Sequence, residues 1–78
     1  MDDRTADAAA EFGRRVRLAR KEQGLSQEAF AFLAGLNRSY VGQVERGEKN
    51  VTLGTIIRLS EALALNPGVL VDALGSSR

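Results

Sequence analysis

Apolar residues recur along this chain at spacings of three and four, which is the period of an α-helix. No stretch alternates with a period of two, so the sequence predicts an all-α fold. The first helix is expected over residues 5–23, where Phe12, Val16 and Ala19 form its buried stripe and Gly24 closes it.

Two short helices with a break between them are predicted within residues 27–46. Ser26 suits the N-cap of the first helix, because its hydroxyl can accept from an unpaired backbone N–H. Glu28 then lies in the first turn, at the positive end of the helix dipole. Phe30, Ala31 and Ala34 share one face, which is expected to be buried.

Gly35 is expected to end this helix in a left-handed conformation, and Leu36 to turn inward. Asn37 can cap the second helix, whose Val41 and Val44 face the core. The remaining side chains point outward: Arg38, Ser39, Gln43 and Arg46, with Gly42 a blank position among them.

A fourth helix is predicted after Thr52 as N-cap, with Leu65 just beyond its end. Asn66 and Pro67 then begin a last short helix over residues 68–74, and residues 75–78 are expected to fray. In the fourth helix four residues are expected to face the core: Leu53, Ile56, Leu59 and Leu63.

The last helix is apolar around most of its circumference, more than contact on one side requires. The simplest second cover is another copy of the chain, and the alternative is a helix tucked fully into its own monomer. The proposed pairing residues are Ile57, Val69, Leu70, Val71 and Leu74.

Two helices joined by a short turn around a glycine indicate a helix-turn-helix. Polar side chains near the N-terminus of its second helix are what reading of the DNA major groove requires. The competing interpretation is an ordinary solvated face of a small helical protein.

Three motifs, Gly24-Leu-Ser-Gln-Glu, Ala34-Gly-Leu and Ser39-Tyr-Val-Gly-Gln-Val-Glu-Arg-Gly, resemble the Cro/repressor-type (XRE-like) helix-turn-helix family over roughly residues 12–70. Within it, Arg38-Ser-Tyr-Val, Glu45-Arg-Gly and Asn50-Val-Thr-Leu look most like the controller proteins of restriction–modification systems. The resemblance implies an ion pair between Arg20 and Glu45 and pairing through the final helices. A two-fold dimer would present two recognition helices about one turn of DNA apart, so an inverted-repeat operator is expected.

Arg38 is the best candidate for a base contact, because its guanidinium matches guanine through two hydrogen bonds; Ser39 and Gln43 come next. Gly42 departs from the usual polar occupant and would let the backbone approach the groove closely. Contacts to the DNA backbone are expected from Gln27, Asn37, Tyr40, Arg46, Lys49 and Asn50.

The chain has 78 residues, which indicates one small domain, and a net charge of only +1. Its distribution is uneven, since residues 13–58 carry nine basic and four acidic residues, whereas both flanking segments are net negative. The positive charge is thus concentrated on the segment that contains the helix-turn-helix, as binding to a polyanion requires.

The chain contains no Cys and no His, which removes disulfides, thiolate and imidazole catalysis and the usual zinc ligands. We therefore expect no enzyme activity, metal, cofactor or small-molecule ligand. The start of the chain has no apolar signal region and no run could span a bilayer, so a cytoplasmic location is expected. Two alternatives stay open: a DNA-binding antitoxin of a toxin–antitoxin pair, and a helical protein-interaction module that does not bind DNA.

Overall fold

The computed structural model describes residues 1–75, which fold into five α-helices with no strand among them. The predicted all-α architecture is therefore confirmed. Residues 76–78, part of the end that was expected to fray, lie outside the described residues. The helices are α1 (Asp3–Glu22), α2 (Gln27–Ala34), α3 (Arg38–Glu45), α4 (Leu53–Ala62) and α5 (Pro67–Val71).

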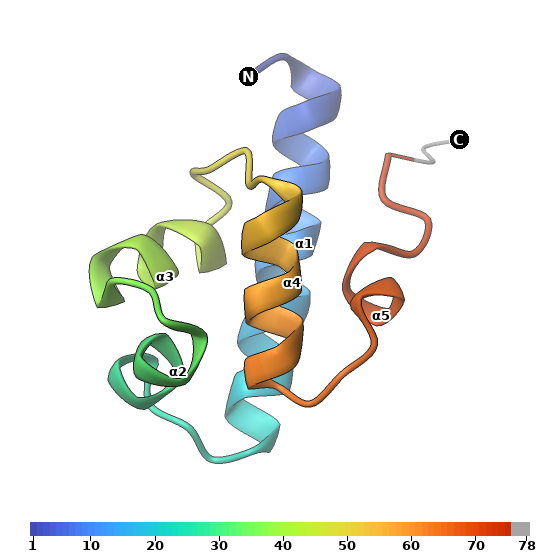
Figure 1. Cartoon of the computed structure of the whole chain (residues 1–78). Coiled ribbons are helices and arrows are strands. Elements are labelled where there is room, and N and C mark those ends of the chain that lie inside the picture. The colour runs from blue at the N-terminus through green and yellow to red at the C-terminus, as the bar shows by residue number, and fades with distance from the viewer. Residues whose placement is uncertain (76–78) are drawn as a thin grey trace.

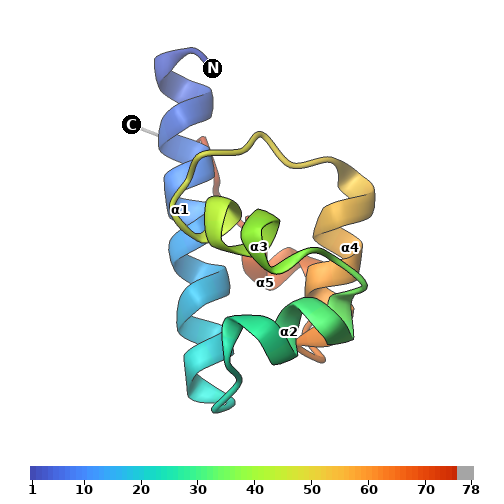
Figure 2. The ribbon, with the colours of Figure 1, turned by 90° about the vertical axis from the view of Figure 1, so that its left-hand side faces the viewer.

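The helices form a ring around a single core. Helix α2 and helix α3 lie to one side of α1 and α4, and α5 lies to the other (Figure 1). The perpendicular view separates α1 from α4, with α2 and α3 crossing in front of the gap and α5 behind it (Figure 2). Helix α1 contacts both α3 and α5, whereas α4 contacts both α2 and α5. No helix within residues 1–75 is long and apolar enough to cross a membrane.

Polar N-caps set where the helices begin. The side chains of Ser26, Asn37, Thr52 and Asn66 each accept a hydrogen bond from a backbone N–H of the first turn, as predicted. Asp2 caps α1 in the same way, so that helix begins at Asp3, two residues before the predicted start.

Glycines in the left-handed region end the first three helices. Gly24, Gly35 and Gly47 have φ values of 71°, 69° and 77°, which confirms the prediction of positive φ at these positions. Ala64 occupies the same conformation after α4, with φ 55°, although its Cβ disfavours it.

The core contains the apolar residues that the periodicity predicted, with one exception. Leu53 is 79% exposed, so its assignment to the core was wrong. A rotation of about 100° per residue places Leu53 at the edge of the face formed by Ile56, Leu59 and Leu63, on the same side as Ile57. The buried apolar cluster comprises Phe12, Val16, Phe30, Ala31, Ala34, Val41, Val44, Leu59, Leu63 and Leu70.

The last helix is shorter than predicted. It ends at Val71, because Asp72 has an extended ψ of 129° and Ala73 has a positive φ of 61°. Leu70 is only 1% exposed and belongs to the core, so its assignment to a pairing surface was wrong. Leu70 anchors this short helix in the core of its own monomer, and Val71 packs against the same core.

Candidate nucleic-acid interface

A buried ion pair fixes the end of α3 against α1, as the resemblance implied. Arg20 Nε donates to Glu45 Oε2 at 2.6 Å, and Arg20 Nη2 donates to Glu45 Oε1 at 2.9 Å. The two side chains are only 9% and 2% exposed, and the hydrogen bonds to Glu45 raise the pKa of Arg20. Arg20 Nη1 also donates to the Leu25 carbonyl at 2.9 Å, so one guanidinium ties α3 to the turn that precedes α2.

A glycine brings the backbones of α1 and α3 into direct contact. A Cβ on Gly13 would overlap the carbonyl oxygen of Val44 and would lie 2.8 Å from that of Glu45. Sequence reasoning missed this role. The available signal was a glycine inside an otherwise regular helix, which costs stability unless a close approach requires it.

The first turn of α3 presents the candidate base-reading side chains to solvent. Arg38 and Ser39 are exposed, and Gln43 is half-buried one turn after Ser39 on the same face. The Asn37 carboxamide oxygen accepts from the Ser39 backbone N–H at 2.7 Å. The Asn37 cap therefore holds this turn in helical form through the backbone, without engaging the candidate base-reading side chains.

Gly42 lies on the same side of α3 as Arg38, Ser39 and Arg46, where the side chains of Arg46 and Gln27 cover it, and the close approach of its backbone to DNA stays a prediction. It is buried, and a Cβ there would meet Arg46 Nη1 at 3.2 Å and the Gln27 side-chain amide at 3.8 Å. Gln27 also donates from Nε2 to Glu45 Oε1 at 3.1 Å, so the start of α2 is tied to the end of α3.

The residues expected to contact the DNA backbone differ in their exposure and in the partners that they already have. Arg46 is exposed but donates from Nε to Glu48 Oε2 at 2.8 Å, and this hydrogen bond lowers the pKa of Glu48. Lys49 and Asn50 are exposed in the following loop, whereas Gln27 and Tyr40 are half-buried.

This arrangement matches a known family. The helix-turn-helix family profile covers residues 16–70, which include α2, α3 and α4 entirely. The chain belongs to the helix-turn-helix family. Control protein C.BamHI of Bacillus amyloliquefaciens is 42% identical over 62 residues, which span 78% of this chain and 76% of that protein.

Solved structures share both the fold and part of the sequence. The restriction-modification controller protein C.AhdI of Aeromonas hydrophila has 53% identity and a TM-score of 0.78, covering 80% of this chain and 94% of its own. The P22 c2 repressor, solved in complex with a synthetic operator, has 30% identity and a TM-score of 0.73, covering 78% of this chain and 92% of its own.

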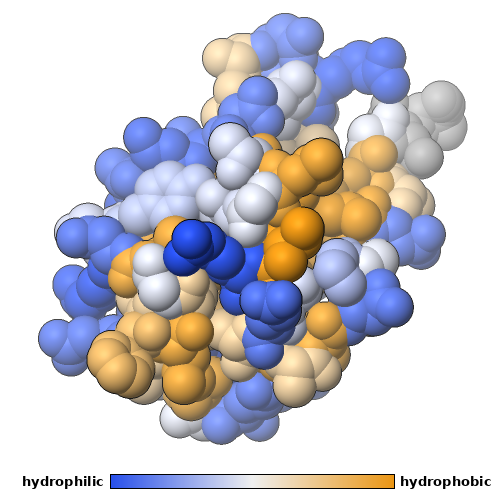
Figure 3. Space-filling model, viewed as in Figure 1, coloured by the Kyte–Doolittle hydropathy of each residue, from blue (hydrophilic) through white to orange (hydrophobic). Residues whose placement is uncertain are grey.

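Away from the first turn of α3, this helix-turn-helix protein exposes apolar side chains on α4 and α5. Ile57 is 47% exposed and Val69 is 56% exposed, while Val71 and Leu74 are half-buried against the core. The exposed side chain of Leu53 lies on the same side of α4 as Ile57, four residues away. Figure 3 shows hydrophobic atoms gathered over α4 and continuing toward the C-terminal segment. A separate exposed pair, Phe32 and Leu33, lies on α2 and was not predicted.

Proposed function

We propose that this chain is a sequence-specific, double-stranded DNA-binding transcriptional regulator, acting as the controller protein of a restriction–modification system. The observation that carries the proposal is the exposed first turn of α3, with Arg38 and Ser39, on a helix locked by the buried Arg20–Glu45 pair. The identity to C.BamHI and C.AhdI supports the controller role, and the likeness to an operator-bound repressor supports DNA binding.

In this proposal α3 enters the major groove. Arg38 contacts a guanine through two hydrogen bonds, and Ser39 and Gln43 contact neighbouring base edges. Arg46, Lys49 and Asn50 contact phosphates beside the groove and set the position of the protein on the duplex. Three further backbone contacts come from Gln27, Asn37 and Tyr40, of which Gln27 lies at the N-terminus of α2.

One α3 can reach only a few base pairs, so two copies are needed for a specific site. We infer a homodimer that pairs through the exposed apolar side chains Ile57, Val69 and Leu53, with Val71 and Leu74 at the margin. A two-fold dimer presents two reading helices about 34 Å apart, one turn of DNA, so the operator is an inverted repeat with that spacing. The chain then works as a single, non-enzymatic domain in the cytoplasm.

Selection from a random-sequence duplex library tests the proposal. The wild-type protein should enrich an inverted repeat, and fluorescence anisotropy should then measure affinity for that duplex and for an unrelated one. Arg38→Ala should lose about 1–3 kcal/mol on the enriched duplex with little change on the unrelated one. Arg46→Ala should weaken binding to both and reduce the salt dependence by about one ion per subunit.

Arg17→Ala is the charge-matched control, because Arg17 is exposed and belongs to α1, so its loss removes one positive charge without changing α3 itself. If Arg17→Ala and Arg38→Ala had equal effects, binding would depend on general charge and not on reading by α3. Failure to enrich any sequence would refute the proposed function itself.

A further inference from the structure

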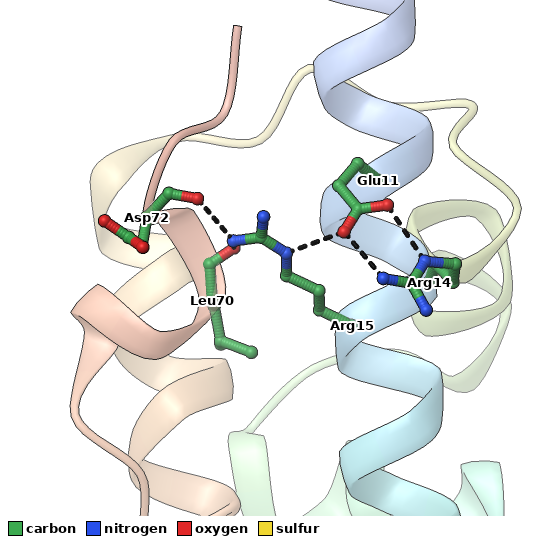
Figure 4. Close-up of polar contacts among 5 residues, drawn as sticks. All are labelled: Glu11, Arg14, Arg15, Leu70 and Asp72. Carbon is green, nitrogen blue, oxygen red and sulfur yellow. Dashed lines mark hydrogen bonds and ion pairs between the residues drawn. The ribbon is translucent and has the colours of Figure 1, made fainter. Parts of the chain in front are cut away.

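The C-terminal end of α5 is held by an arginine from α1. Arg15 Nη1 donates to the carbonyl of Asp72 at 2.8 Å and to that of Leu70 at 3.3 Å (Figure 4). Carbonyls at the end of a helix lack partners within the helix, and a cationic side chain can supply them. Arg15 therefore stabilises the point at which the chain leaves α5.

Glu11 orients this arginine. Its Oε2 accepts from Arg15 Nε at 2.8 Å, one turn away on α1, and Figure 4 shows the carboxylate lying between Arg15 and Arg14. Arg14 donates to both carboxylate oxygens of the same Glu11, at 2.8 and 2.9 Å. Of the two arginines that bind Glu11, Arg15 is the one that also binds carbonyls at the end of α5, so a variant of Arg14 serves as the control.

The same helix also holds the reading helix. Arg20, five residues after Arg15 on α1, binds Glu45 at the end of α3. Five residues correspond to about 7.5 Å along the helix and about 140° around it, so the two arginines reach out on different sides of α1. Helix α1 thus fixes α3 through Arg20 and α5 through Arg15.

We propose that Arg15 is a positioning residue for assembly: it sets the place of α5 relative to α3, and so the separation of the two reading helices on DNA. Leu70 anchors one side of this five-residue helix in the core, while Val69 on its other side is 56% exposed for a second copy. Without Arg15 the carbonyls of Leu70 and Asp72 lose this donor, and the orientation of the exposed side of α5 depends on the packing of Leu70 and Val71. The inference rests on the proposed function, since it assumes a dimer that binds two half-sites.

The role of Arg15 is tested on the full chain with Arg15→Ala and the control Arg14→Ala. Both variants remove one charge and one partner of Glu11 from α1. Sedimentation equilibrium should show the dimer dissociation constant of Arg15→Ala raised about tenfold or more, with Arg14→Ala within about twofold of wild type. Circular dichroism melting confirms that the monomers compared are folded.

A second measurement separates positioning from a loss of stability. Synthetic duplexes carry the two enriched half-sites with the selected spacer, or with one base pair added or removed. Wild type and Arg14→Ala should lose about tenfold in affinity on the altered spacers. Arg15→Ala, measured at concentrations where it is dimeric, should lose about threefold or less in affinity on the same duplexes. A retained tenfold preference for the selected spacer in Arg15→Ala would overturn the inference.

If Arg15→Ala does not fold, Glu11→Gln serves instead, because it leaves Arg15 in place and removes the carboxylate that orients it. Its dimer dissociation constant should rise by more than that of Arg14→Ala, and equality between the two would overturn the inference. A wild-type chain that neither dimerises nor binds DNA would refute the proposed function. A wild-type dimer whose Arg15→Ala and Arg14→Ala variants behave alike would refute only the role of Arg15.

Discussion

Replacing Arg20 with methionine should be among the most damaging single changes in this fold. Methionine preserves much of the apolar part of the side chain and removes its charge. The Glu45 carboxylate, whose side chain is only 2% exposed, would keep the Gln27 amide as its partner among residues 1–75. The Leu25 carbonyl would also lose its donor.

Removing one partner of a buried ion pair costs about 3–5 kcal/mol, because the other charge stays buried without compensation. The 78-residue chain is expected to have a total stability of about 4–12 kcal/mol. Arg20→Met should therefore consume a large part of that stability and lower the melting temperature by about 12 °C or more.

Urea unfolding followed by circular dichroism measures the effect. The double variant Arg20→Met with Glu45→Met removes both charges, and it should recover most of the loss because no unpaired charge remains buried. Glu48→Gln is the control, since it breaks the exposed pair with Arg46 and should unfold like wild type. The reasoning would be refuted by a loss of about 1 kcal/mol or less in Arg20→Met, or by a double variant at least as unstable as the single one.

Four further predictions concern packing, backbone strain, pH and assembly. Gly13→Ala should lose about 3 kcal/mol or more, because its Cβ overlaps the Val44 carbonyl, whereas Gly54→Ala on exposed α4 should gain about 0.5–1 kcal/mol; urea unfolding of both checks this. Ala64→Gly should stabilise the fold by about 0.5–1 kcal/mol by relieving its positive φ, and an unchanged or lower urea midpoint would contradict it. Hydrogen bonds from Arg14 and Arg15 lower the pKa of Glu11 from 4.5 to about 2, so this carboxylate stabilises the folded state above pH 4.5 and the contribution is lost as the pH falls toward 2. Thermal melts at pH 5 and pH 2.5 should therefore show a smaller pH effect in Glu11→Gln than in wild type. Val69→Asp should give a folded monomer by sedimentation, whereas Leu70→Asp should unfold the chain, because Leu70 is buried within its own monomer.

Local chemistry explains why most of the fold could be predicted. The N-caps Ser26, Asn37, Thr52 and Asn66 act on backbone N–H groups two or three residues away, and so can be recognised without knowing the tertiary structure. The positive φ values of the glycines that follow the first three helices are equally local. The Arg20–Glu45 pair spans 25 residues and came from the resemblance, since no periodicity relates the two positions.

The predictions that were wrong depended on which neighbours cover a residue. Leu70 and Val69 are adjacent apolar residues on one short helix, and only the positions of α1 and α4 decide that Leu70 is covered while Val69 is not. Leu53 satisfied the helical spacing of the core but lies in the first turn of α4, at the edge of its buried face. Burial at the ends of elements is a tertiary property that an apolar pattern alone cannot resolve.

A close backbone contact and a shared carboxylate explain how α3 is held in place. Gly13 lets the backbone of α1 touch that of α3, and Gln27 at the start of α2 donates to Glu45 at the end of α3. With the ion pair from Arg20, these contacts fix α3 from α1 and from the start of α2. Because the helix is already ordered, DNA binding has to immobilise only exposed side chains such as Arg38, at about 0.5–1.5 kcal/mol each. Sequence discrimination can then follow from a few base contacts, since little binding free energy is spent on folding the helix that makes them.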